Sequence, residues 1–217
     1  MTVDAAPHLS QHDLPGWFGK LPGMGDFAQR RLPEQFRQAW DSWLQTGLFD
    51  LRGRKPDWVE RYLEGPIWFF ALGAQLVGPH PWLGVMLPSV DSAGRYFPLT
   101  LAIELPDPHS SLPQRSATWA RQWWERSAQA ALAALEHDLD ANRFESALNQ
   151  VFQGEAGTGV PDGLRVCMPA PGQSTWRTHP VDDALPTLQV AGLPTASAFD
   201  ALFGYGIDTS QAIEATR

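Results

Sequence analysis

The pattern of apolar and polar positions predicts a β-hairpin at the centre of the chain. Residues 82–87 and 96–103 are two apolar, strand-like runs, and residues 88–95 between them are rich in Pro, Ser, Asp and Gly. These residue types favour a turn, so we expect the two runs to pair as antiparallel strands. The charged residues Asp91 and Arg95 then lie on the connecting loop.

Shorter apolar runs predict further strands. Residues 17–20 are expected to form a short strand that is followed by a bend over 21–27. Residues 67–77 are nearly uncharged and are bounded by Gly and Pro, which predicts a buried strand. Two late strands are expected over 164–168 and 174–178, joined by a turn that contains Pro and Gly.

Apolar residues at helical spacing predict several helices. The first begins at Pro33 and places Phe36, Trp40 and Trp43 on one face, with Gly47 near its end. We expect this aromatic stripe to pack on the sheet as part of the core. The other predicted helices span 57–64, with Trp58, Tyr62 and Leu63 facing inward, 114–140, 143–152 and 195–203.

Together these elements indicate an α+β fold, a mainly antiparallel β-sheet packed by several α-helices in a single compact domain. With 217 residues and 43% hydrophobic content, the chain can bury one substantial core. We expect the domain to span residues 15–205, between a flexible N-terminal tail over 1–14 and a C-terminal tail over 206–217. Residues 106–113 and 154–163 are expected to be a linker and a loop.

The charge of the chain narrows the classes of partner. A formal net charge of -8 argues against binding to nucleic acid or to an anionic membrane, because such binding needs clustered Lys and Arg.

The lone Cys167 excludes an internal disulfide and fits a reducing compartment. The first residues lack a secretory signal, and no apolar run reaches the roughly 20 residues that span a bilayer. We therefore expect a cytoplasmic protein without a membrane span.

Motifs for cofactors and metals are incomplete. The pair Gly19-Lys20 lacks the leading glycine and the Ser or Thr of a phosphate-binding loop. Gly23 and Gly25 lack the third glycine of a dinucleotide site, and a turn explains them better. Among the six histidines, His8 and His12 share a helical spacing but lie in the predicted flexible tail, where solvated histidines are favoured over a metal site. We expect no cofactor and no metal.

The loop between the two central strands carries the remaining candidates for chemistry. Asp91 and Arg95 could brace each other or present a polar contact site, and turn chemistry favours the brace. We expect Arg95 to lie partly buried against Asp91 or Asp26. An alternative is a small-ligand-binding or hydrolytic enzyme that uses Ser89, Asp91 and Arg95, although Ser89 lacks the surrounding glycines of a nucleophile elbow.

Five ordered motifs resemble one protein family. They are Trp-Phe-Gly-Lys-Leu-Pro-x-x-Gly-Asp-Phe at 17–27, Arg-Arg-Leu at 30–32, Trp-Asp-x-Trp-Leu at 40–44, Pro-x-Trp-x-Phe at 66–70 and Pro-Ser-Val-Asp-x-x-Gly-Arg-Tyr-Phe-Pro-Leu at 88–99. In this order they resemble the TagF (ImpM) family, which is associated with bacterial type VI secretion.

The resemblance implies a non-enzymatic cytoplasmic regulator. The family resemblance implies that such a protein represses the secretion apparatus after translation by binding a forkhead-associated-domain scaffold. The sequence does not decide whether the chain also forms a homodimer. The motif positions supply the residues that we expect to bind a partner or to form a structural clasp. These residues are Asp26, Arg30, Arg31, Asp41, Ser89, Asp91 and Arg95.

Overall fold

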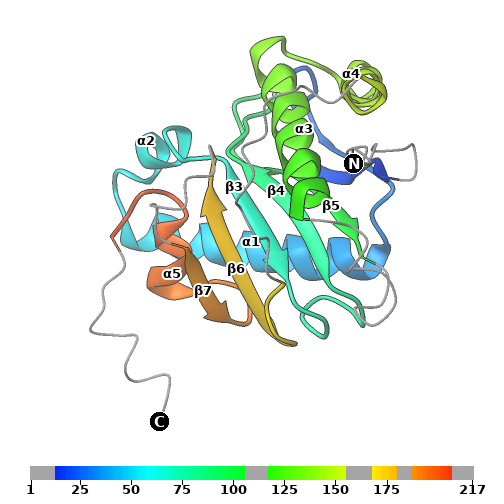
Figure 1. The fold of residues 1–217 in the computed structure, drawn as a ribbon. Helices are drawn as coiled ribbons and strands as arrows, with labels where there is room; N and C mark the ends of the chain where they lie inside the picture. The colour runs from blue at the N-terminus through cyan, green and yellow to red at the C-terminus, as the bar shows by residue number, and fades with distance from the viewer. Residues whose placement is uncertain (1–12, 106–116, 155–167, 180–186, 207–217) are drawn as a thin grey trace.

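A seven-stranded antiparallel sheet lies at the centre of the computed structural model, which describes residues 13–105, 117–154, 168–179 and 187–206 (Figure 1). Within these residues the strand order is β2-β1-β5-β4-β3-β6-β7, and each neighbouring pair is antiparallel. The strands are β1 (Gly16–Lys20), β2 (Phe27–Arg30), β3 (Trp68–Leu72), β4 (Trp82–Leu87), β5 (Leu99–Glu104), β6 (Gln173–Thr178) and β7 (Leu188–Ala191).

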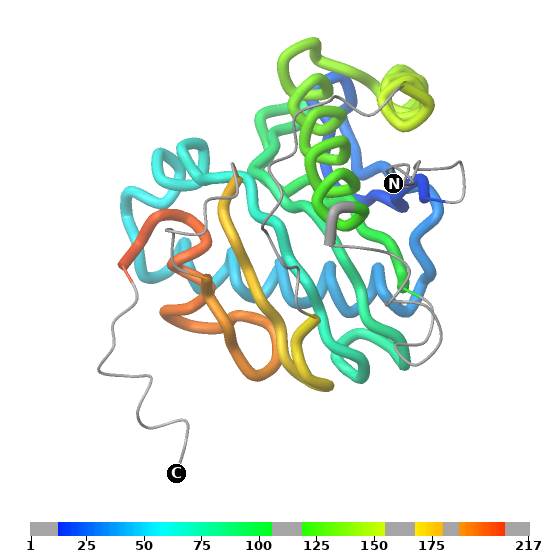
Figure 2. Tube along the Cα trace, in the orientation of Figure 1, coloured from blue at the N-terminus to red at the C-terminus, as the bar shows by residue number. Residues whose placement is uncertain are grey.

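Helices cover both faces of the sheet. In Figures 1 and 2, α3 crosses one face with α4 beside it, and α1 crosses the opposite face with α5 near one end. The helices are α1 (Glu34–Arg54), α2 (Trp58–Leu63), α3 (Ala117–Glu136), α4 (Ala141–Gln153) and α5 (Ala196–Ala201). The expected α+β fold, with a mainly antiparallel sheet packed by helices, is confirmed.

The predicted central hairpin is present as β4 and β5. Val85 pairs with Leu101 in the middle of their register, and both side chains are buried. Strand β3 lies beside β4, with Phe69 facing α3 and Phe70 facing α1. Because both faces are covered, these strands are continuous apolar runs instead of alternating ones.

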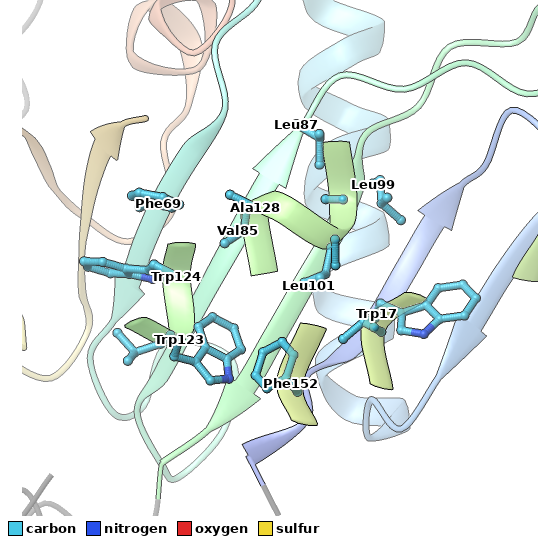
Figure 3. Close-up of a cluster of buried hydrophobic side chains, with 14 of the residues drawn as sticks. Trp17, Phe69, Val85, Leu87, Leu99, Leu101, Trp123, Trp124, Ala128 and Phe152 are labelled. Atoms are coloured by element: carbon cyan, nitrogen blue, oxygen red, sulfur yellow. The ribbon is translucent and has the colours of Figure 1, made fainter. Parts of the chain in front are cut away.

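The core between the sheet and α3 is aromatic. Figure 3 shows Trp123 and Trp124 of α3 over the side chains of the central strands. Trp124 stacks on Phe69 with ring centroids 5.2 Å apart. Trp17 of β1 contacts Phe144 of α4 edge to face at 5.1 Å. The sequence contains ten tryptophans, and these contacts show that several of them serve specific packing in the core.

The predicted aromatic stripe of α1 forms the core on the other face. Phe36, Trp40, Leu44 and Leu48 are buried there, and the indole nitrogen of Trp40 donates to Thr100 Oγ1 at 2.9 Å.

The structure corrects several expected boundaries. Helix α1 continues past Gly47 to Arg54. Gly47 is a close-approach site instead of a helix end, since a Cβ there would collide with the ring of Phe199. Strand β3 ends at Leu72 instead of continuing to residue 77. Leu63 at the end of α2 is 53% exposed, whereas the sequence pattern placed it inward.

Two short strands, β2 and β7, were not predicted. Both are edge strands with polar residues and little burial, so their sequences carry no clear alternation. Strand β6 pairs with β3 and β7, and its predicted partner over 164–168 lies almost entirely outside the described residues, as does Cys167. The linker over 106–113, most of the loop over 154–163 and most of the two tails lie outside them as well.

Candidate functional site

The site is built on the segment between β4 and β5. Residues Val90 and Tyr96 form an isolated β-bridge, and the amide of Asp91 donates to the carbonyl of Arg95 at 3.1 Å. The amide of Gly94 donates to the carbonyl of Asp91 at 2.9 Å, and Gly94 has a φ of 75°. The left-handed conformation that closes this turn is one that glycine adopts without strain.

The carboxylate of Asp91 is the centre of the turn. Its Oδ1 accepts hydrogen bonds from the amides of Ala93 at 3.0 Å and Arg95 at 2.9 Å. Its Oδ2 accepts from Lys20 Nζ at 2.5 Å and from Arg95 Nε at 2.8 Å. The carboxylate is therefore engaged by four donors, and its side chain is fully buried. We call Lys20, Ser89, Asp91 and Arg95 the Asp91 cluster.

The electrostatics of the cluster favour the ionised carboxylate. Burial by itself raises the pKa of Asp91, but the hydrogen bonds from Lys20 and Arg95 and from the turn amides lower it more. The net effect holds the pKa of Asp91 well below its usual range. Lys20 is buried in this ion pair, so the charge of each residue is stabilised by the other.

Arg95 contacts Asp91, as predicted. Its side chain is 55% exposed, so it is less buried than the sequence pattern suggested. Its second guanidinium nitrogen donates to the carbonyl of Gly25. The neighbouring amide of Ser92 donates to the carbonyl of Met24 at 2.9 Å. Arg95 thus lies over the surface of the cluster and links two loops, while Lys20 is the buried partner.

Ser89 serves the backbone around it. Its Oγ donates to the carbonyl of Lys20 at 2.8 Å, and the residue is 2% exposed. Its amide donates to the hydroxyl of Tyr62 at 3.0 Å, and that hydroxyl donates to the carbonyl of Ser89 at 2.9 Å. A nucleophilic serine donates its hydroxyl hydrogen to a side chain that can act as a base, whereas the hydroxyl of Ser89 donates to a backbone carbonyl.

Two further candidates lie on the surface near β2. Asp26 lies in a bend and accepts a hydrogen bond from the adjacent amide of Phe27 at 2.8 Å. Arg30 is exposed and contacts Asn142 of α4 at 3.5 Å. Neither residue joins the Asp91 cluster through a hydrogen bond or ion pair within the described part of the chain.

Arg31 belongs to a second polar contact. Its guanidinium donates to both carboxylate oxygens of Glu145 on α4 and to the carbonyl of Pro15. The indole of Trp17 donates to the same carboxylate at 3.0 Å. Burial raises the pKa of Glu145, and the hydrogen bonds from Arg31 and Trp17 outweigh this and lower it. This contact fastens the turn between β2 and α1 to α4.

Asp41 is half-buried on α1, apart from both polar contacts. Its charge interacts with Arg37 one turn earlier on the helix. The seven candidate residues are therefore spread over several places, and the structure joins three of them, Ser89, Asp91 and Arg95, in one cluster.

Sequence reasoning missed Lys20, Tyr62 and Glu145. Lys20 was considered as part of a phosphate loop, a strand and the first family motif, and no local pattern indicated that its charge would be buried. Tyr62 was assigned to the core, and nothing local indicated its hydrogen bonds to Ser89. Within the described residues, no group of three His, Cys, Asp or Glu could hold a metal ion, and no helix there is long and apolar enough to cross a membrane.

Comparisons with known proteins identify relatives. The model of the TagF N-terminal domain, described as type VI secretion system-associated, matches residues 16–151. This match includes the whole Asp91 cluster. The crystal structure of PA0076 from Pseudomonas aeruginosa PAO1 is similar, with a TM-score of 0.65 and 28% sequence identity, over 87% of this chain and 93% of that one. No curated relative matches the sequence.

Proposed function

This chain belongs to the TagF family of type VI secretion system-associated proteins, and we propose that it is a non-enzymatic cytoplasmic regulator of that system. In this proposal it represses secretion after translation by binding a forkhead-associated-domain scaffold component. The family match over residues 16–151 is the observation that carries the proposal.

The polar groups of the motif residues are bonded to other groups of this chain, which supports a binding role. Asp91 is held by Lys20 and Arg95, and the hydroxyl of Ser89 is held by a backbone carbonyl. These polar groups fix the shape of the loops between the strands, and a fixed loop surface suits recognition of another protein. The alternative enzyme that would use Ser89, Asp91 and Arg95 gains no support from this geometry.

The proposal is tested in the native host by deleting the gene and measuring secretion of a substrate of the type VI system. We expect secretion to rise while the transcript levels of the secretion genes stay unchanged. Affinity purification of the tagged chain is expected to recover the scaffold component. Unchanged secretion after deletion, together with no scaffold component in the purified material, would contradict the proposal.

A further inference from the structure

Phe49 is a large apolar side chain that the fold leaves in solvent. It lies on α1 and is 77% exposed. It borders a surface depression of about 490 Å³, which we call the α1 groove, lined by Gln45, Thr46, Leu48, Phe49, Arg52 and Phe97. An exposed aromatic residue at the edge of a groove is a common feature of protein interaction sites.

The groove is built from fixed parts. Gln45, Phe49 and Arg52 recur at spacings of four and three residues, so they form a stripe along one side of α1. Phe97 lies in the groove and is 4% exposed. Its ring is held edge to face by Phe27, with centroids 4.8 Å apart. Because these aromatic contacts hold the Phe97 side chain in place, little conformational entropy is lost in the groove when a partner binds.

The groove has a positively charged end. The guanidinium of Arg52 lies 4.4 Å from the centroid of the Trp58 ring, and Trp58 contacts Tyr96 edge to face. Arg52 is exposed and forms no ion pair within the part of the chain that the structure describes. The guanidinium of Arg52 is therefore held against an aromatic ring, and it is a positive surface group in a chain with a formal net charge of -8.

The opposite end of the same stripe has a different charge. Asp41 lies one turn before Gln45, and its charge interacts with Arg37. Arg37 also pairs with Glu34. Two carboxylates and one guanidinium therefore lie toward this end, while the guanidinium of Arg52 lies at the other. A partner with negative charge would bind with its acidic part at Arg52.

We propose that the α1 groove binds a peptide segment of a partner protein that combines an apolar anchor residue with acidic side chains. The anchor packs against Phe49 and Phe97, and an acidic side chain pairs with Arg52. Charge complementarity at Arg52 and the apolar floor argue for this occupant. The inference rests on the proposed function, because it names the surface through which this chain binds its partner.

The test uses arrays of 15-residue peptides probed with the full chain. One array covers the cytoplasmic components of the host's type VI system, and a second carries random sequences. Bound peptides are then measured in solution by fluorescence anisotropy against the wild type, Phe49→Ala, Arg52→Gln and the control Arg143→Gln. Arg143 is exposed on α4, across the sheet from the groove.

We expect the bound peptides to be enriched in Asp and Glu beside an aromatic or aliphatic residue. Phe49→Ala should weaken binding at least about tenfold. Arg52→Gln should weaken it about fivefold and reduce its dependence on salt, and Arg143→Gln should leave it unchanged. Both groove positions are exposed, so circular dichroism is expected to show folded variants.

Two outcomes separate this inference from the proposed function. If acidic, apolar peptides bind the groove but deletion of the gene leaves secretion unchanged and no scaffold component is recovered, the docking site stands and the role in type VI secretion fails. If the scaffold component binds wild type, Phe49→Ala and Arg52→Gln equally well, the proposed function stands and the groove is not its docking site. Bound peptides without acidic residues would also overturn the inference.

Discussion

Lys20 Nζ donates to Asp91 Oδ2 across 2.5 Å, although 71 residues separate them in the sequence. The contact joins the end of β1 to the segment between β4 and β5. Both side chains are almost completely buried. A buried ion pair of this kind is costly to break by removing one partner, because the other charge then remains in the interior.

Replacing Lys20 with Met is expected to lower the free energy of unfolding by about 3 kcal/mol, because Asp91 loses its buried cation. Replacing the exposed Arg95 with Ala should lower it by less than about 1 kcal/mol. Urea unfolding followed by tryptophan fluorescence measures both changes. Equal losses for the two variants would show that Lys20 is not the main partner of Asp91.

The ion pair also predicts how stability depends on pH. The pKa of Asp91 is lowered in the folded protein, by hydrogen bonds that outweigh burial, and is about 3.9 in the unfolded chain. A lowered folded pKa contributes stability that is complete above the unfolded pKa and is lost as the pH falls toward the folded value. The free energy of unfolding should therefore fall between about pH 5 and pH 2.

The variant Asp91→Asn isolates this contribution. Its free energy of unfolding should change less over the same pH interval than that of the wild type, by on the order of 2 kcal/mol. Asp26→Asn, which changes an exposed carboxylate outside the Asp91 cluster, serves as the matched control. Parallel profiles for the wild type and Asp91→Asn would contradict the assignment.

The hydroxyl of Tyr62 is bonded to both the amide and the carbonyl of Ser89. Tyr62→Phe leaves these two buried backbone groups without their partner, so we expect a loss of about 2 kcal/mol in thermal or urea unfolding. The hydroxyl of Tyr96 makes no hydrogen bond to the described residues, and Tyr96→Phe should cost less than about 0.5 kcal/mol. A similar loss in both variants would point to ring packing instead.

Two glycines of α1 should respond in opposite directions to alanine. Gly53 has open space where a Cβ would lie, so Gly53→Ala should stabilise the protein by about 0.5 kcal/mol through helix propensity. At Gly47 the added methyl group meets the buried ring of Phe199, and Gly47→Ala should destabilise it by about 2 kcal/mol. Melting temperatures that rise for Gly47→Ala would show that α5 can move away.

Local patterns in the sequence predicted much of this fold. The strands β4 and β5 followed from two apolar runs around a turn, and the buried stripe of α1 followed from helical spacing. The end of α1 was wrong because Gly47 serves a contact with Phe199 on α5, which no local pattern shows. The edge strand β2 was missed because its four residues are mostly exposed and its pairing with β1 decides its conformation.

The part of the candidate site that depends on local sequence was predicted, and the part that depends on long-range contacts was not. Asp91 and Arg95 are four residues apart, so turn chemistry could bring them together. Lys20 and Tyr62 reach the same segment through the sheet and through α2, and those contacts depend on the whole topology. Arg95 was expected to be partly buried because its burial was inferred from the motif, whereas Lys20 occupies the interior position.

Direct titration of the purified chain with the purified forkhead-associated-domain scaffold component of the same host tests the central proposal most directly. Isothermal titration calorimetry should show saturable binding with a Kd of about 10 µM or tighter, in the range of specific transient complexes. Phe49→Ala should weaken this binding while the fold is retained. No measurable binding by the wild-type chain at about 100 µM would contradict the account.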